Sequence, residues 1–440
     1  MLLKVCALFV VVRLTQYGLI FLAPVSQFDT STELLLKDLL VPQDLAASYW
    51  NIHLYNKLLA WDAVYFIKGM VSPGNNAHKY EHEYAFSNVW IQIVRWFIDD
   101  KRSTDVYYVL KTAIALENIF YFVSIIILYY LTVVTFSKNV ISSNNLSYKV
   151  ATKASMLFVL SSASGFLTGI YSEPVSFLFA FIGMLARELA IVSKTPYQLD
   201  VTWIYWPHYT IISSISFSVA VMNRSNCILL GIYYVFDLFQ LLKMKNYGKA
   251  IFFPLLSGML LFMAFFYTQY YIPFSIFCPE RGDWCETQII KSLPFTWQSF
   301  YPTIQSKYWN VGFLKYWTLN NIPNFLFALP NLIALSYSTI YFAKIYPCYN
   351  LIPLIWITRL LLIILFFFAH VQIINRISSF IPLHLWYLSD RLVKKSVINK
   401  KKYDNNESKG DDKIVKFYIY WLIIWIPLQT ILFANFLPPA

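Results

Sequence analysis

The residues best suited to chemistry lie in one short stretch between residues 61 and 86. It opens with Trp61-Asp62 and ends with Tyr80-Glu81-His82-Glu83-Tyr84-Ala85-Phe86. Carboxylates and a histidine sheltered among aromatic rings are typical of functional sites, because burial and neighbouring charges shift their pKa values. We therefore take Asp62, Glu81 and Glu83 as candidate catalytic residues. The competing interpretation is that they are solvated loop charges, as most carboxylates are.

A metal site is a second possible use of this stretch. His78 and His82 stand four residues apart, a spacing that would place both on one face of a helix. The turn at Pro73 to Asn76 makes the start of such a helix uncertain, and no third ligand follows at a spacing typical of zinc. We therefore expect no metal, and interpret His82 as a hydrogen-bonding partner of a neighbouring carboxylate.

The composition indicates that most of the chain lies in a membrane. Of the 440 residues, 58% are hydrophobic and only 13% are charged, whereas a soluble domain carries about 25% charged residues. A soluble core could not hide so much apolar surface, so we expect a polytopic membrane protein. The net charge of +12 comes largely from lysines in short loops between apolar runs. That pattern is typical of the positive-inside bias and argues against nucleic-acid binding.

Apolar runs of about 20 residues, the length that crosses the hydrocarbon layer, recur along the chain. The first is Val5 to Ala23, where Arg13 interrupts the apolar centre that a cleaved signal peptide needs, so we expect a retained span with a cytosolic N-terminus. The others begin near Thr112, Ala151, Pro174, Pro207, Asn226, Ala250, Asn321, Leu351, Ile377 and Phe417. We predict an all-α polytopic fold, a single domain over residues 1–440 with roughly ten to eleven transmembrane helices. The short run at 377–389 either spans or is re-entrant.

The basic loops predict the orientation. Lysines group at 138–153, at 243–249 and at 394–402, so these segments, and the basic loop over 390–415, are expected in the cytosol. Counting spans outward places a large first loop over 24–110 and a second over 273–318 together on the opposite side. Cys278 and Cys285 lie in that second loop, where a disulfide would form in an oxidising compartment; two free thiols are the alternative. An ER lumen would explain both the disulfide and a site on this side.

Three further clusters at membrane edges are expected to face the same side. They are Tyr171-Ser172-Glu173, Asn223-Arg224-Ser225-Asn226, and His370-Val371-Gln372 with Asn375 and Arg376. Ionisable residues near a bilayer are costly and tend to line cavities or pathways. Each cluster alone could simply cap a helix end or reach the headgroups. Together with the stretch over residues 61–86, which we call the Asp62 loop, these three clusters indicate a shared site.

These residue types suit the transfer of a sugar from a lipid phosphate. A carboxylate can deprotonate an acceptor hydroxyl, while Arg224 and Arg376 can hold a phosphate through forked, charge-assisted hydrogen bonds. The phosphate is already a competent leaving group, whereas a glycosidase needs two carboxylates flanking the bond. A transporter would predict inverted sequence halves and paired broken helices, and neither is visible in the sequence. A non-catalytic scaffold subunit would have no use for the carboxylate-rich aromatic loop.

The order and spacing of these motifs resemble the GPI mannosyltransferase 2 family. Trp61-Asp62 followed by residues 81–86 resembles its first luminal loop. The other matching segments are Tyr171-Ser172-Glu173, Arg224-Ser225-Asn226, the Cys278 to Cys285 loop, His370-Val371-Gln372 with Arg376, and Gln305-Ser306-Lys307-Tyr308-Trp309-Asn310-Val311-Gly312-Phe313-Leu314-Lys315-Tyr316-Trp317, continuing to Ile322-Pro323-Asn324-Phe325. One departure is that Ser87-Asn88 stands where the family usually has a Pro-Gly turn.

The resemblance implies a GT-C type glycosyltransferase of the ER membrane with its site in the lumen. It would use dolichyl-phosphate mannose, with no cofactor, and form an α-1,6 bond to the first mannose of the GPI intermediate. Another dolichyl-phosphate-sugar transferase of the same class is the nearest alternative. The implied partners are the donor, the mannosylated GPI lipid intermediate and the ER membrane, with a small accessory membrane subunit as a further candidate.

An inverting displacement assigns a role to each candidate residue. Asp62 is expected to be the base at the acceptor hydroxyl, and Glu81 or Glu83 is the alternative base or orients the acceptor. The expected substrate-binding residues are Trp61, stacked on a sugar ring; Arg224, Arg376 and His370 on the dolichyl phosphate; Tyr308, Trp309 and Asn310 on the acceptor side; and His82, Glu173 and Asn226.

Overall fold

The computed structural model describes residues 1–39, 48–71, 80–139, 144–195, 198–278, 285, 300–397 and 406–437. In the first half of the chain the elements are α1 (Leu2–Leu22), α2 (Ser31–Leu39), α3 (Ala63–Val71), α4 (Asn88–Trp96), α5 (Val106–Asn139), α6 (Asn144–Val159), α7 (Glu173–Ala190), β1 (Ile191–Thr195), β2 (Gln198–Val201) and α8 (Ser214–Asn223). In the second half they are α9 (Ile232–Lys243), α10 (Tyr247–Ala250), α11 (Leu256–Phe266), α12 (Ile272–Phe277), α13 (Phe300–Trp309), α14 (Ile322–Ile345), α15 (Ile352–Phe367), α16 (Ile374–Ile377), α17 (Leu383–Val397) and α18 (Asn406–Ala434). The predicted all-α membrane fold is confirmed.

Six helical segments among the described residues are long and apolar enough to cross a membrane. They are Leu2–Leu22, Val106–Lys138, Ser225–Lys243, Tyr247–Phe277, Leu319–Ile345 and Asp412–Ala434. The other expected runs form shorter helices, namely α6, α7, α8, α15 and α17. Helix α7 is buried around most of its circumference, which is the pattern of a helix in the centre of a bundle.

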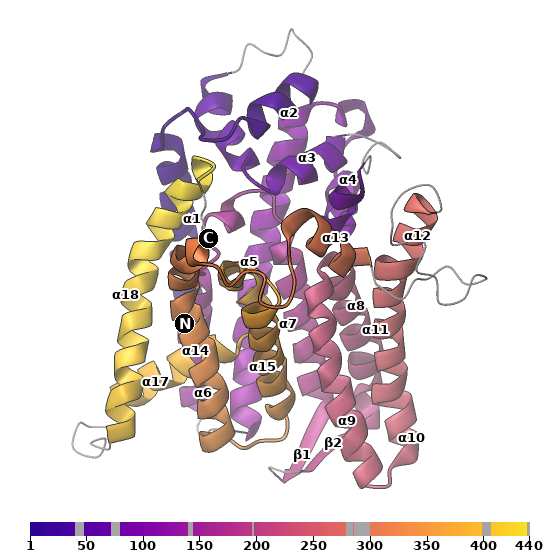
Figure 1. Cartoon of the computed structure of the whole chain (residues 1–440). Helices are drawn as coiled ribbons and strands as arrows, with labels where there is room; N and C mark the ends of the chain where they lie inside the picture. Colours follow the sequence, from indigo (N-terminus) through magenta and orange to yellow (C-terminus); the bar gives the residue numbers. More distant parts are fainter. Residues whose placement is uncertain are drawn as a thin grey trace.

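The two ends of the bundle are built differently. Figure 1 shows α2, α3 and α4 gathered at one end, whereas the β1–β2 hairpin and α10 lie at the other. The hairpin pairs Ile191 with Val201. At the end that holds α3, a hydrophobic cluster joins this helix to the rest of the bundle, and it includes Phe66, Trp90, Tyr171 and Phe433. This cluster fixes the Asp62 loop against the membrane helices.

The connection between α6 and α7 runs through the interior of the bundle. The backbone N–H of Gly165 donates to the Gln429 side chain of α18 at 2.8 Å, and the Ser164 hydroxyl accepts from Gln16 of α1 at 2.7 Å. A Cβ added at Gly165 would lie 2.8 Å from the Phe433 Cβ and 3.0 Å from the Gln429 carbonyl oxygen. Glycine is therefore required here by the close approach of α18. This buried connection, residues 160–172, delivers Glu173 to the start of α7.

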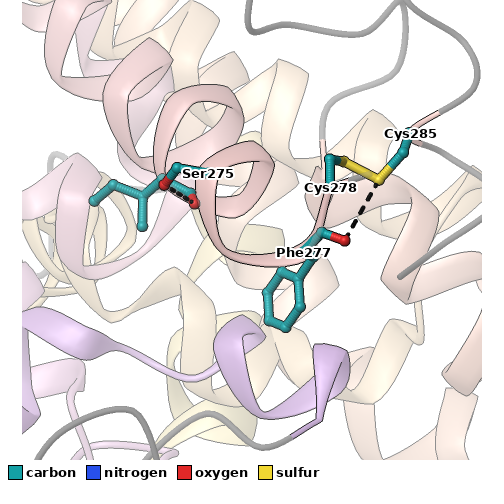
Figure 2. The surroundings of a disulfide bond; sticks show 5 residues. Ser275, Phe277, Cys278 and Cys285 are labelled. Atoms are coloured by element: carbon teal, nitrogen blue, oxygen red, sulfur yellow. Dashed lines mark hydrogen bonds between the residues drawn. A yellow bond between two sulfur atoms is a disulfide. The ribbon is translucent and has the colours of Figure 1, made fainter. Parts of the chain in front are cut away.

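A disulfide joins the end of α12 to Cys285, as Figure 2 shows. The Cα atoms of Cys278 and Cys285 lie 5.6 Å apart, within the usual range for such a bond. Next to it, the rings of Phe277 and Phe300 stack with their centroids 5.7 Å apart. The same cluster touches Tyr84 of the Asp62 loop. The two loops expected on one side of the membrane are thus in contact.

Candidate active site

Four charged side chains from distant parts of the chain meet in one ionic cluster. Arg376 contacts Asp62 at 2.9 Å and Glu173 at 2.7 Å, and Arg224 contacts Glu173 at 2.8 Å. We call Asp62, Glu173, Arg224 and Arg376 the charged cluster. They come from the loop before α3, the start of α7, the end of α8 and the short helix α16. The sequence clusters expected to share a site are therefore brought together.

The exposure of the two carboxylates separates their roles. The Asp62 side chain is 25% exposed, whereas that of Glu173 is 5% exposed. Glu173 lies between the two guanidinium groups, and one of its oxygens, Oε2, is buried without a hydrogen-bond partner in the described structure. Asp62 has one arginine partner and remains accessible. Asp62 can therefore meet an acceptor hydroxyl, and Glu173 is better placed to hold the arginines.

The backbone in front of Asp62 is unusual. Trp61 has φ of 60°, a left-handed conformation that is costly for a large side chain and is found mainly where the surroundings enforce it. Its ring stacks on Phe436 with centroids 5.2 Å apart, which fixes the conformation. The Trp61 ring was expected to stack on a sugar, and Phe436 covers one of its two faces. The Trp61 indole N–H is buried without a partner in the described structure.

Arg376 is held by aromatic rings as well as by ions. Its guanidinium carbon lies 4.8 Å from the Phe166 ring centroid and 5.4 Å from that of Tyr171. Both rings belong to the buried connection between α6 and α7, and the Tyr171 hydroxyl donates to the Ala60 carbonyl at 3.0 Å. A planar guanidinium stacked on aromatic rings loses less freedom when it binds an anion. The site thus presents Arg376 in one orientation.

Arg224 links the charged cluster to a large cavity. The cavity has a volume of 860 Å³, and Arg224, Ser225 and Asn226 form part of its wall. Most of the remaining lining is apolar, and it includes Ile93 of α4, Phe265 of α11, Phe300 of α13, Leu361 and Leu365 of α15, and Phe368. One wall is therefore cationic and the rest suits a hydrocarbon chain.

Tyr301 is a site residue that the motifs did not include. It lines the cavity, and burial raises the pKa of its hydroxyl, on which all four residues of the charged cluster also act. Tyr301 therefore stands where the apolar cavity meets the charges. A sequence signal did exist: Tyr301 lies four residues before Gln305 on α13, and Gln305 also lines the cavity.

The departure from the family pattern at Ser87 has a structural role. Its hydroxyl accepts from the Trp90 backbone N–H at 3.1 Å, which caps α4, and it donates to the Asn223 side chain. The Asn223 amide in turn donates to the Ser172 carbonyl at 2.7 Å. Ser87 thus ties the first loop to the residues immediately before Arg224 and Glu173.

Glu81 and Glu83 have ion partners outside the charged cluster. Glu83 binds Lys68 of α3 and accepts from the Tyr80 backbone N–H at 3.1 Å. Glu81 accepts from the Tyr308 hydroxyl at 3.3 Å and lies 3.7 Å from the Lys307 ammonium. Glu83 therefore orders its own loop, while Glu81 connects that loop to α13.

His82 packs among aromatic rings beside these glutamates. Its ring centroid lies 5.1 Å from that of Tyr308 and 5.7 Å from that of Tyr65, and its Nδ1 is buried without a hydrogen-bond partner in the described structure. Burial lowers the pKa of His82. No group of three or more His, Cys, Asp and Glu side chains suited to a metal was found within the described ranges, and His78 lies outside them.

The segment after α13 reaches the other predicted residues. His370 Nε2 hydrogen-bonds the Trp309 carbonyl at 2.9 Å, and its ring stacks on Tyr316 with centroids 4.4 Å apart. Asn310 has φ of 51° where α13 ends, a conformation that asparagine tolerates. His370 and Asn310 thus shape the loop after α13.

The sequence comparisons with known proteins agree with one another. A family model described as Mannosyltransferase (PIG-V) matches residues 3–440. GPI mannosyltransferase 2 of Saccharomyces cerevisiae is 56% identical over 432 residues, covering 98% of this chain and 98% of that protein. The Candida glabrata protein of the same name is 50% identical over 442 residues, covering 100% and 99%. Among solved structures, an oligosaccharyltransferase from Archaeoglobus fulgidus matches 98% of this chain and 55% of its own, with 11% identity and a TM-score of 0.47. The family resemblance carried by the motifs is confirmed, and the chain belongs to the PIG-V mannosyltransferase family.

Proposed function

We propose that this protein transfers the second mannose of the GPI anchor from dolichyl-phosphate mannose to the mono-mannosylated precursor, through an α-1,6 bond, on the luminal side of the ER membrane. The observation that carries the proposal is the position of Arg224. It forms part of the wall of an 860 Å³, largely apolar cavity and also contacts Glu173 of the charged cluster. The name shared by the relatives supports the GPI precursor as the acceptor.

The donor combines a long hydrocarbon chain with a charged phosphodiester, and the cavity suits both parts. The apolar lining would take the isoprenoid chain, because moving it out of lipid into a polar cavity would be unfavourable. The phosphate would lie at the Arg224 end, where a guanidinium can donate two parallel hydrogen bonds to its oxygens. Tyr301 lines this cavity and would donate a further hydrogen bond to the phosphate.

The chemical step would be an inverting displacement at the anomeric carbon of the mannose. The acceptor 6-hydroxyl oxygen forms the new bond while the bond between that carbon and the phosphate oxygen breaks. Asp62 takes the hydroxyl proton, and dolichyl phosphate leaves with the bonding electron pair. Arg376, whose guanidinium contacts Asp62 and Glu173, would stabilise the negative charge that develops on the departing phosphate, because it is a positioned cation. Glu81 of the first loop and Tyr308 of α13, which are hydrogen-bonded to each other, would orient acceptor hydroxyls.

The test is mannose transfer by the purified protein, assayed with and without any membrane subunit that co-purifies. The donor is dolichyl-phosphate mannose and the acceptor a mono-mannosylated GPI lipid, and the product should be cleaved by an α-1,6-specific mannosidase. Dolichyl-phosphate glucose serves as the competing donor, and a short-chain phosphate mannose tests the cavity. A product with another linkage, equal use of the glucose donor, or no transfer in either preparation would overturn the proposal.

A further inference from the structure

We propose that Asn331, in the interior of α14, is a positioning residue that holds Arg376 in the charged cluster. The inference rests on the proposed function, because it assigns Asn331 an effect on donor binding and turnover. Asn331 is fully buried. A polar amide in the middle of an apolar membrane helix is costly unless its hydrogen bonds are satisfied, so its partners are informative.

Asn331 is the centre of a hydrogen-bond network in which each polar atom of its amide has a partner. Its amide nitrogen donates to the Ser162 hydroxyl at 2.8 Å and to the Asn375 side-chain oxygen at 2.7 Å. Its own oxygen accepts from the Tyr418 hydroxyl at 2.6 Å. Four segments, the connection after α6, α14, α16 and α18, are joined at this one side chain.

The network reaches Arg376 through the residue beside it. Asn375 precedes Arg376 on the single helical turn of α16, and Asn375 is 1% exposed. The side-chain amide of Asn375 also donates to the backbone carbonyl of Phe327 in α14 at 3.2 Å. The backbone carbonyl of Asn375 accepts from the Ser162 hydroxyl at 2.7 Å. A helix of one turn has little stability of its own. The bonds of Asn375 therefore hold the backbone from which the Arg376 side chain extends.

The same network also positions the aromatic wall on which Arg376 rests. Ser162 lies at the start of the buried connection that carries Phe166 and Tyr171, and its carbonyl accepts from the Trp425 indole N–H at 2.9 Å. Asn331 thus holds both the segment that bears Arg376 and the segment that bears the rings beneath its guanidinium. A shift of either segment would separate Arg376 from Asp62. Displacements of about 1 Å in a reacting site can cost about 10²-fold in rate.

The decisive experiment is a double-mutant cycle between Asn331 and Arg376. Asn331→Leu keeps the branched shape of the side chain and removes its hydrogen bonds, while Arg376→Lys keeps the charge and removes the forked geometry. Transfer is measured per folded protein as kcat and as KM for dolichyl-phosphate mannose, with thermal stability measured on each sample. Ser338→Ala is the matched control, because Ser338 lies on the same helix, is buried, and donates only to the Leu335 carbonyl one turn away.

We expect Asn331→Leu to lower kcat/KM about 10- to 100-fold, and to have almost no further effect when Arg376 is already lysine. Tyr418→Phe, which removes one bond of the network, should fall between Asn331→Leu and the wild-type protein, and Ser338→Ala should keep wild-type kinetics. If Asn331 only stabilises the fold, thermal stability falls while kcat/KM per folded protein does not. Full additivity in the cycle would also overturn the proposal. An inactive wild-type protein would refute the proposed function. Loss of activity confined to the Asn331 variant would leave the proposed function standing.

Discussion

The three candidate catalytic carboxylates, Asp62, Glu81 and Glu83, differ in the partners that they bind. Glu83 is bound to Lys68 and to a backbone N–H, so its charge is used within the loop. Glu81 meets a tyrosine hydroxyl and a lysine at the edge of α13. Asp62 meets an arginine that also contacts Glu173. Asp62 is therefore the carboxylate that shares an arginine with the rest of the charged cluster.

Asp62→Asn should depress turnover strongly and leave donor binding largely intact. The amide oxygen can still accept from Arg376, so the local structure should survive, but the amide cannot take the acceptor proton. A positioned base is typically worth about 10²- to 10⁴-fold in rate. The measurement is kcat per folded protein, with expression checked alongside. Glu81→Gln and Glu83→Gln are the matched controls, and near-normal turnover in Asp62→Asn with loss in either glutamine variant would transfer the role to that glutamate.

Arg224→Gln should weaken donor binding more than it slows the chemical step. The change removes one of the two guanidinium groups on Glu173 and the cationic side chain at the cavity wall. A hydrogen bond to a charged group contributes about 1.5–3 kcal/mol, so KM for the donor should rise about 10- to 100-fold. Arg102→Gln is the control, because Arg102 forms an exposed ion pair with Asp105 elsewhere in the first loop. An unchanged donor KM in Arg224→Gln would remove Arg224 from the phosphate site.

His82 should make the protein less stable in acid. Burial lowers its pKa below the ordinary value of 6.5, so the folded state disfavours the charged imidazole. The stability linked to this group is present in full above the unfolded pKa and is lost as the pH falls through the lowered folded value. Melting temperatures at about pH 7.5 and about pH 5.5 should therefore differ less in His82→Gln than in the wild-type protein. Equal differences in both proteins would contradict the assignment.

At the scale of elements, the buried connection between α6 and α7 controls the site. It passes against α1 and α18, supplies the rings beneath Arg376, and ends at Glu173. A Cβ at Gly165 would meet the backbone of α18 at Gln429 and Thr430, which cannot move aside as the end of a flexible side chain can. The element that matters most for the site is therefore one with little regular structure.

Gly165→Ala should destabilise the protein and lower its activity together. The added methyl group would meet the backbone of α18 at 3.0 Å, and overpacking of this kind costs about 1–3 kcal/mol. We expect a lower melting temperature in detergent and a reduced kcat, because the same shift moves Phe166 and Glu173. Gly18→Ala is the control, since nothing lies within 4 Å of a Cβ placed there. A Gly165→Ala protein as stable as Gly18→Ala would show that α18 can yield.

Much of the fold follows from the sequence, because apolar length decides where a membrane helix can form. The runs beginning near Ala250 and Asn321 lie within the apolar helices Tyr247–Phe277 and Leu319–Ile345. The ion pairs of the candidate site could not be predicted from apolar length or from residue spacing. That Arg376 meets Asp62, and Glu83 meets Lys68, depends on packing between segments far apart in the chain. Spacing also did not indicate that Trp61 stacks on Phe436.

At the scale of the whole molecule, ion pairs occur at both ends of the bundle. Away from the charged cluster, Arg187 donates to both oxygens of Asp237 at 2.8 and 2.6 Å, and the Tyr209 hydroxyl donates to Asp237 at 2.6 Å. Both ions are fully buried. This network joins α7 to α9 beside the β1–β2 hairpin, and Lys138 completes that end by donating to the Glu188 carbonyl at 2.6 Å. Because Arg187 and Asp237 are buried and bonded to each other, we assign this network a structural role, in contrast to the accessible Asp62.

The orientation of the bundle is the last prediction, and it can be tested without any substrate. Lysines occur at the end of the bundle that holds the β1–β2 hairpin and α10 (Figure 1), among them Lys249 of α10 and Lys138, which donates to the Ile191 carbonyl of β1. The positive-inside bias places that end in the cytosol. Protease added to sealed microsomes should therefore cut within residues 394–402 and leave the loop after Cys278 intact. Opening the vesicles with detergent provides the control, because the second loop should then also be cleaved. Cleavage near Cys278 in sealed vesicles, with 394–402 protected, would place the charged cluster on the cytosolic side. The arginines would then face the wrong leaflet for a luminal donor, so the reversed result would refute the proposed side of the reaction even if the family and the chemistry stand.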